Sequence, residues 1–187
     1  AVEKCDVCII MVDATEGVSE QDTKIAGYAH DNGRASIIAV NKWDLIEKND
    51  KTMDEFKKTV ADKLSFMSYA PQVYISAKTG QRTENLLETV NFVHEKHNTR
   101  ISTGTLNDII NEAIQKNQAP SDKGKRLKIY YATQSSSAPP TFVLFVNDSE
   151  LMHFSYLRYL ENQIRAAFNL TGTPVKFIIR ERQEKEQ

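Results

Sequence analysis

Asn41-Lys42-Trp43-Asp44 and Ser76-Ala77-Lys78 are two short polar strings, and each follows a run rich in β-branched and aromatic residues. Ser36-Ile37-Ile38-Ala39-Val40 precedes the first string, and Gln72-Val73-Tyr74-Ile75 precedes the second. Apolar runs of this length that end in turn residues predict buried strands. In open α/β sheets, ligands bind beyond the carboxyl ends of parallel strands. We therefore expect the two strings to form one ligand site.

The residue types in the two strings suit a guanine base. Guanine presents two adjacent donors, N1–H and the 2-amino group, and the carboxylate of Asp44 can accept both, whereas adenine leaves this carboxylate unpaired. A buried acceptor without a partner costs about 1–3 kcal/mol, so we expect the site to bind guanine much more tightly than adenine. We expect the aliphatic stems of Lys42 and Lys78 to cover the two faces of the base. The Ala77 N–H is expected to donate to guanine O6, and Ser76 to hold the Asp44 carboxylate.

The predicted guanine site therefore consists of Asn41, Lys42, Asp44, Ser76, Ala77 and Lys78. An isolated N-K-x-D string also occurs by chance, as a strand end followed by a solvated turn. The second string, placed after a second predicted strand, favours the binding site over this interpretation. We interpret Trp43 as a packing residue, with shielding of the site as the alternative.

The first half of the chain alternates predicted strands and helices. The strands are expected at 7–13, 36–40 and 72–76, and the helices at 19–33, 52–67 and 83–97. We expect Ser19 to cap the first helix, Thr52 and Glu55 to form a capping box at the second, and the third to bury its apolar residues, which are Leu86, Leu87, Val90 and Val93. This β-α-β-α-β-α order predicts a parallel sheet with helices on both faces.

The second half has a different order of predicted helices and strands. After a polar link at 98–104, we expect a helix from Thr105, strands at 127–133 and 141–146, a helix at 155–168 and a last strand at 175–179. The loop 134–140 is judged too long for a tight hairpin. The order α-β-β-α-β indicates a small α+β domain, and the charged tail 180–187 is expected to fray.

Composition places the chain among soluble globular proteins, with 187 residues, of which 40% are hydrophobic and 26% charged. The longest apolar run, Val7 to Val12, is far shorter than the ~20 residues of a membrane helix, and no secretory signal is visible at the first residues. We therefore expect a cytoplasmic protein with no membrane partner. Cys5 and Cys8 form a C-x-x-C without a second pair, so we interpret them as small apolar residues and expect no metal site. His94 and His97 suit the dipole at a helix C-terminus.

Charge and aromatic residues leave two questions open in the second half. Residues 1–98 carry a net charge of −4 and residues 99–187 a net charge of +3. The only basic cluster, Lys123 to Lys128, either contacts phosphate or is a solvated loop. Four aromatic residues on the predicted strands either form the core, which we favour, or offer stacking platforms for RNA bases. They are Tyr130, Tyr131, Phe142 and Phe145.

Both halves together resemble the C-terminal portion of the Der family, also called EngA, the bacterial tandem GTPases of ribosome assembly. In the first half the resemblance rests on Asp13-Ala14-Thr15-Glu16-Gly17, Asn41 to Asp44 and Ser76-Ala77-Lys78-Thr79-Gly80-Gln81. In the second half it rests on three longer strings, which are Leu127 to Gln134, Pro139 to Asp148 and His153 to Asn162. The resemblance covers essentially the whole chain.

This resemblance implies a P-loop-NTPase-like parallel sheet in residues 1–98, the later part of a second G domain, and a KH-like domain in residues 99–187. Family members are expected to bind GTP or GDP with magnesium, to hydrolyse GTP and to act in maturation of the large ribosomal subunit. The implied partners are therefore a guanine nucleotide and the large subunit or its rRNA.

Two family features are missing from the sequence. It contains no G-x-x-x-x-G-K-[ST] loop to hold the β- and γ-phosphates, and no D-x-x-G segment precedes the first strand. We therefore expect a fragment that begins between motifs, keeps guanine recognition, has no catalytic or magnesium-binding residues and does not hydrolyse GTP alone. The G-x-x-G loop with which KH modules clamp RNA is also missing from the second half. The alternative is a non-catalytic RNA- or protein-binding module whose α/β half is a degenerate G-domain scaffold.

Overall fold

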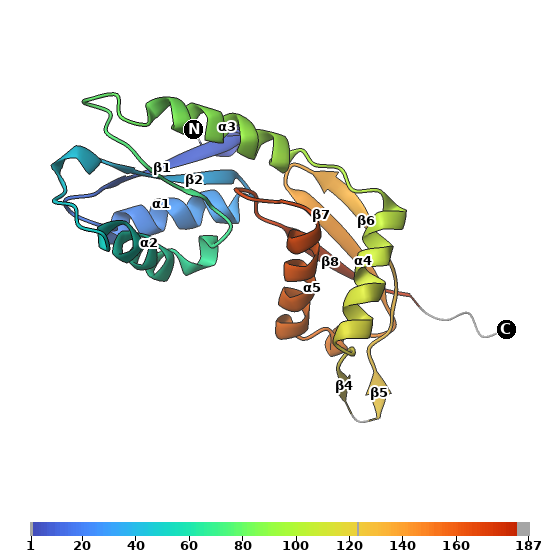
Figure 1. Ribbon diagram of the computed structural model, residues 1–187. Helices are drawn as coiled ribbons and strands as arrows, with labels where there is room; N and C mark the ends of the chain where they lie inside the picture. Colours follow the sequence, from blue (N-terminus) through green and yellow to red (C-terminus); the bar gives the residue numbers. More distant parts are fainter. Residues whose placement is uncertain (1, 123, 183–187) are drawn as a thin grey trace. The chain divides into compact units, whose positions relative to one another are not determined.

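Two units make up the chain in the computed structural model, which describes residues 2–122 and 124–182 (Figure 1). Unit 1 holds the chain up to Asn98 together with Leu170–Pro174. Unit 2 holds Thr99–Asn169 and the chain from Val175 onward. A short stretch from late in the sequence thus belongs to the first unit.

Unit 1 is built on a parallel sheet with the strand order β1-β2-β3. Its elements in chain order are β1 (Val7–Asp13), α1 (Glu20–Asp31), β2 (Ala35–Asn41), α2 (Thr52–Lys63), β3 (Gln72–Tyr74) and α3 (Thr83–His97). In the register of the sheet, Asp13 at the end of β1 lies opposite Asn41 at the end of β2. The predicted β-α-β-α-β-α order is confirmed.

The central strand β2 is buried on both faces of the sheet. Its side chains alternate between the faces, so Ile38 and Val40 join the core formed with α1 and α2, while Ile37 and Ala39 join the core formed with α3. Figure 1 shows α3 on one side of the strands and α1 and α2 on the other. The prediction of helices on both faces of the sheet is therefore confirmed, with β2 buried on both.

The strand β1 is buried on one face only. Ile9 and Met11 are 42% and 48% exposed, whereas Ile10 and Val12 lie in the core. The apolar run at 7–13 also predicts a buried strand, and this prediction is wrong for Ile9 and Met11, because β1 pairs only with β2 among the described strands and α3 does not cover this end of the face.

The helix starts were predicted with mixed success. Ser19 caps α1 as expected, because its hydroxyl accepts from the N–H of Asp22 at 3.1 Å and the Asp22 carboxylate accepts from the Ser19 N–H at 2.9 Å. The capping box predicted from Thr52 is wrong. Asn49 takes that place instead, since its Oδ1 accepts from the Thr52 N–H at 3.0 Å and its own N–H donates to the Thr52 hydroxyl at 2.9 Å.

One of the α3 residues predicted to be buried lies outside the core. Leu86 and Val93 are buried as predicted, but Leu87 is 64% exposed. Neighbouring residues of a helix point about 100° apart, so a helix on a sheet buries Leu86 and leaves Leu87 toward solvent.

The segment Leu170–Pro174 completes unit 1. The N–H of Gly172 donates to the Tyr69 carbonyl, and its carbonyl accepts from the Ser36 N–H, both at 2.7 Å. Gly172 has φ +81°, and a Cβ atom at this position would lie 2.4 Å from Val93 Cγ2. Only glycine therefore fits between the sheet and α3 here.

His97 meets the same segment from the end of α3. It is 1% exposed, and its Nδ1 lies 2.8 Å from the Thr173 hydroxyl. Burial lowers the pKa of His97 to about 4, so the ring is neutral at pH 7. A neutral ring brings no positive charge to the helix C-terminus, so the interpretation of His97 through the helix dipole is wrong.

Unit 2 has helices against a mixed sheet. Its elements in chain order are α4 (Thr103–Lys116), β4 (Ser121–Asp122), β5 (Lys125–Arg126), β6 (Ile129–Ser137), β7 (Pro140–Val146), α5 (Phe154–Ala167) and β8 (Lys176–Glu181). The strand β7 is central, antiparallel to β6 and parallel to β8. The predicted α-β-β-α-β order is confirmed, with a two-stranded ribbon β4-β5 added to it. No helix among the described residues is long and apolar enough to cross a membrane.

The loop predicted at 134–140 is wrong. The strand β6 continues to Ser137 and β7 begins at Pro140, so two residues join them. Gln134 pairs with Phe142 and Ser136 with Thr141, with an irregularity in the register between the two pairs. Serine is a weak strand former, but hydrogen bonds to a neighbouring strand override that preference. Part of the tail predicted to fray, 183–187, lies outside the described residues.

The aromatic strand residues of unit 2 divide between the two faces of the sheet. Phe142 is fully buried, which confirms the core interpretation for this residue. The interpretation is wrong for Tyr131, which is 37% exposed and stacks on the half-buried Phe145 with ring centroids 4.3 Å apart.

The Gly172→Ala substitution should destabilise unit 1. We expect a loss of about 2–4 kcal/mol in the free energy of unfolding, because the new methyl group meets Val93 and the left-handed backbone strains alanine. Urea denaturation followed by circular dichroism measures it. Gly27→Ala is the matched control, since it lies in α1 with open space around it and should gain about 0.5–1 kcal/mol. Equal stability of both variants would contradict the packing role of Gly172.

Unit 1 should lose stability in mild acid through His97. The folded state holds the pKa near 4, below the value of 6.5 of a free imidazole, so protons bind preferentially to the unfolded chain between these values. Stability is complete above pH 6.5 and falls by at most about 3 kcal/mol as the pH drops to 4. Urea denaturation at several pH values should show a shallower slope for His97→Gln than for the wild type. The same slope in both would assign the acid sensitivity to other groups.

Candidate functional site

The carboxyl ends of the three parallel strands are joined by Asn41, the last residue of β2. Its backbone carbonyl accepts from the Ala14 N–H after β1, and its side-chain Oδ1 accepts from the Ala77 N–H after β3, both at 2.9 Å. The Trp43 N–H also donates to the Ile75 carbonyl at 3.0 Å. These contacts bring the two polar strings together.

The carboxylate of Asp44 is held by Ser76. A hydrogen bond from the Ser76 hydroxyl keeps the pKa of Asp44 below its usual range, with smaller contributions from the charges of Lys78 and Lys48. Ser76 is fully buried, and its Oγ also accepts from the Thr79 N–H at 3.2 Å. Asp44 is thus oriented by a buried, hydrogen-bonded side chain.

Lys42 adopts a left-handed backbone, φ +62°, and directs its ammonium group toward the end of β1. Its Nζ lies 2.5 Å from Asp13 Oδ2, while Asp13 Oδ1 accepts from the Thr15 hydroxyl at 2.7 Å and the Thr15 N–H at 2.9 Å. The hydrogen bonds from Lys42 and Thr15 lower the pKa of Asp13 to about 2. Asp13 therefore stays charged and orients Lys42.

Asp13 was not among the predicted site residues. The signal was present in the sequence, because Asp13 follows a predicted strand just as the two strings do. Its contact with Lys42 depends on the register that sets Asp13 opposite Asn41.

The remaining side chains of the two strings lie as follows. Lys42 and Lys78 are both exposed, and the ammonium group of Lys42 is engaged with Asp13. The Ala77 N–H already donates to Asn41, so donation to a base O6 requires it to share its hydrogen or to turn. Trp43 is 2% exposed and packs edge-on against Phe56, which confirms the packing interpretation.

This arrangement places an oriented carboxylate beside positively charged side chains at the carboxyl ends of the parallel strands. Asp44 supplies two acceptor oxygens, which suits a ligand with two adjacent donors. Lys48 and Lys78 supply positive charge near it. The groups named here bind and orient, and none of them is a nucleophile paired with a base.

Cys5 lies just before β1 and Cys8 is its second residue, with their sulfur atoms 3.2 Å apart. Burial raises the pKa of Cys8 to about 12, so its thiol stays protonated and unreactive. Among residues 2–122 and 124–182, no three His, Cys, Asp or Glu side chains come together as a metal site would require.

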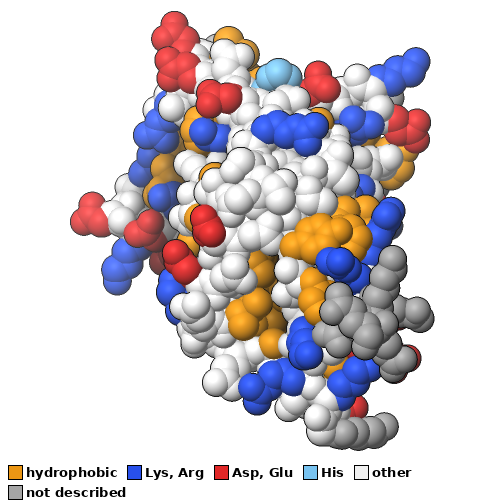
Figure 2. Space-filling view, turned by 90° about the vertical axis from the view of Figure 1, so that its right-hand side faces the viewer, with side chains coloured by type: hydrophobic (Ala, Val, Ile, Leu, Met, Phe, Trp, Pro, Cys, Tyr) orange, Lys and Arg blue, Asp and Glu red, His pale blue; other side chains and the backbone are white. Residues whose placement is uncertain are grey.

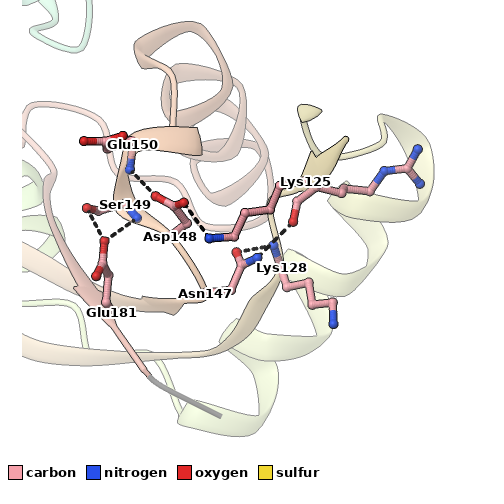
Figure 3. A network of polar contacts seen from close by, with 8 residues as sticks. Lys125, Lys128, Asn147, Asp148, Ser149, Glu150 and Glu181 are labelled. Atoms are coloured by element: carbon pink, nitrogen blue, oxygen red, sulfur yellow. Dashed lines mark hydrogen bonds and ion pairs between the residues drawn. The ribbon is translucent and has the colours of Figure 1, made fainter. Parts of the chain in front are cut away.

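The basic cluster predicted at 123–128 is a structured ribbon rather than a loop, although Lys123 lies outside the described residues. Lys125 Nζ lies 2.8 Å from Asp148 Oδ2, and this contact keeps the pKa of Asp148 below its usual range (Figure 3). Asn147 holds the chain after β5, because its Oδ1 accepts from the Lys128 N–H at 2.8 Å and its Nδ2 donates to the Arg126 carbonyl at 3.0 Å. Part of the positive charge is thus neutralised within unit 2.

Comparison with known families assigns both units. Residues 1–96 match the family model described as the elongation factor Tu GTP binding domain. Residues 100–180 match the model described as the KH-domain-like of EngA bacterial GTPase enzymes, C-terminal.

Whole-chain relatives are highly similar. GTPase Der of Alkaliphilus oremlandii is 61% identical over 182 residues, which are 97% of this chain and 41% of the relative. GTPase Der of Acetivibrio thermocellus is 62% identical over 186 residues, which are 100% of this chain and 42% of the relative. The chain thus spans about two fifths of the length of these curated relatives.

Two solved structures are similar at lower identity. One is Era in complex with MgGDPNP and nucleotides 1506–1542 of 16S ribosomal RNA, with TM-score 0.43, 19% identity and coverage of 96% of this chain and 66% of Era. The other is a probable GTP-binding protein engB, with TM-score 0.41, 23% identity and coverage of 51% of this chain and 60% of that protein.

The two family matches assign the first unit to the family of the elongation factor Tu GTP binding domain and the second to a KH-like module. The chain belongs to the Der (EngA) family of GTPases and matches its C-terminal portion.

The link between Lys42 and Asp13 can be measured directly. In the Lys42→Ala variant, the carboxyl group of Asp13 should titrate at higher pH than the wild-type value of about 2, because its first hydrogen-bond partner is gone. Carbon-detected NMR titration of the aspartate carboxyl groups measures this. Lys78→Ala is the matched control and should leave Asp13 unchanged. An unchanged Asp13 titration in Lys42→Ala would show that the pair does not form in solution.

Proposed function

We propose that the strand-end site binds the guanine base of GTP or GDP through Asn41, Lys42, Asp44, Ser76, Ala77 and Lys78. The observation that carries this proposal is the Asp44 carboxylate held by buried Ser76 at the carboxyl edge of the sheet. Asn41 and Asp13 position the loops around it. Membership of a GTPase family supports the choice of nucleotide.

We further propose that residues 1–98 act as the later part of a G domain and residues 99–187 as its KH-like partner in a longer GTPase. In that protein, magnesium and a phosphate-binding loop complete the nucleotide site and support hydrolysis. This chain has neither the G-x-x-x-x-G-K-[ST] loop nor the D-x-x-G segment ahead of β1, so we assign it base recognition without hydrolysis. Ribosome assembly, with the large subunit or rRNA as partner and the cytoplasm as location, is the cellular role we propose for the longer protein.

Nucleotide selectivity tests the base-recognition proposal. Calorimetry should show weak binding of GDP that is about 5- to 150-fold tighter than binding of ADP, because adenine leaves the Asp44 carboxylate unpaired. Asp44→Asn should shift the preference from GDP to XDP, since xanthine carries an oxygen in place of the 2-amino group. Asp54→Asn, in α2 with an 84% exposed side chain, is the matched control and should change nothing.

Equal binding of GDP and ADP would overturn the role of Asp44. Absence of binding by any nucleotide would favour the alternative, in which unit 1 is a degenerate scaffold for a binding module.

A further inference from the structure

The mixed sheet of unit 2 has one face directed to the core and one directed away from it. Ala132, Phe142 and Leu144 are fully buried on the core face. The strand register places Tyr131, Phe145 and Arg180 in one row on the opposite face. Ile178, two residues before Arg180 in β8, shares that face and is 40% exposed.

The core face is closed by the two helices of the unit. The Asn107 side chain of α4 bonds to the backbone of β6 at Ala132, with both hydrogen bonds at 2.8 Å. The α5 residue Tyr159 donates from its hydroxyl to the Ala113 carbonyl of α4 at 2.8 Å. Figure 1 shows both helices on the same side of β6, β7 and β8. Among the described residues of unit 2, no helix covers the other side of the sheet.

An aromatic pair stands on the uncovered face. The rings of Tyr131 and Phe145 lie 4.3 Å apart and 13° from parallel. The guanidinium carbon of Arg182 lies 5.9 Å from the centre of the Tyr131 ring. The two rings are stacked face to face, and a nucleic-acid base can extend such a stack as a further layer, with the arginine supplying a cation at the ring.

The charge of this face is entirely positive among the described strand residues. Alternation along β8 places Lys176 and Arg180 on it, and Arg182, the residue after β8, lies over the Tyr131 ring. The only acidic residue of the three strands, Glu181, points to the other face and accepts from the Ser149 hydroxyl at 2.6 Å and N–H at 2.8 Å (Figure 3). Figure 2 shows hydrophobic side chains with Lys and Arg side chains beside them in the lower half of the view.

We propose that this uncovered face, defined by Tyr131, Phe145, Lys176, Arg180 and Arg182, binds single-stranded RNA. Bases stack on the aromatic pair while the three cations contact phosphates. The charged residues that define this face are all positive, with no carboxylate among them, and such a surface attracts a polyanion. The choice of RNA rests on the ribosomal part of the proposed function, whereas the surface itself is independent of the guanine site.

The test uses the full chain and a labelled single-stranded RNA of about 12 nucleotides, with binding followed by fluorescence anisotropy. Tyr131→Leu keeps an apolar side chain against Phe145 but removes the ring, and should weaken binding by about 5- to 150-fold. Tyr131→Trp should retain binding. Phe154→Leu is the matched control, because Phe154 is 77% exposed at the start of α5, away from the strands.

Salt dependence tests the cations. Replacing both Arg180 and Arg182 with Gln should reduce the slope of log affinity against log salt by about 1.4, because each phosphate contact on a single strand contributes about 0.7. Arg158→Gln, on the exposed side of α5, should leave the slope unchanged. Circular dichroism of each variant confirms that the fold is intact.

Each outcome has a separate meaning. Wild-type RNA affinity in Tyr131→Leu would overturn this surface while leaving RNA as a partner of the proposed function. No RNA binding by the wild-type chain at about 50 mM salt would overturn both the proposed surface and RNA as a partner. The guanine-site proposal would be unaffected, because nucleotide selectivity tests it separately. Tyr131-dependent self-association, measured by light scattering, would replace RNA with a second copy of the chain.

Discussion

Two hydrogen bonds made by Asn41 hold the strand-end site together. Because β2 is the central strand, its last residue reaches the loop after β1 with its backbone and the loop after β3 with its side chain. The buried Ser76 hydroxyl then orients Asp44, and Asp13 orients Lys42. Without the parallel register that sets Asp13 beside Asn41, these groups belong to unrelated turns. The geometry of the site is thus a property of the sheet as a whole.

The sequence was most informative where a local pattern met a general rule of folds. Buried β-branched runs predicted the parallel sheet, and the rule for strand ends predicted which polar strings meet. Contacts between loops were harder, since the pairing of Lys42 with Asp13 depends on a register that no local pattern contains. The close approach of Gly172 to Val93 was equally hidden, because 79 residues separate them in the chain and the fold alone brings them together.

The two faces of the unit 2 sheet have different environments. Alternate residues of the same strand enter the core or leave it, so Phe142 and Phe145 have opposite environments although they are three residues apart. The sequence pattern alone assigned all the strand aromatics to the core, because periodicity gives the alternation but not which faces are covered. The side on which the helices pack decides which face of the sheet is covered. In unit 2, α4 and α5 lie on the same side.

The return of Leu170–Pro174 to unit 1 affects the order of folding during synthesis. During synthesis the N-terminus of the chain leaves the ribosome first, and units that are continuous in sequence fold as they emerge. Unit 1 is not continuous, because the backbone partners of Ser36 and Tyr69 at Gly172 are made only after most of unit 2. The hydrogen-bond partner of the His97 ring, Thr173, is likewise synthesised only after most of unit 2. Final closure of unit 1 is therefore coupled to synthesis of most of unit 2, and a nascent chain that stops at residue 98 lacks the segment that completes the packing of unit 1.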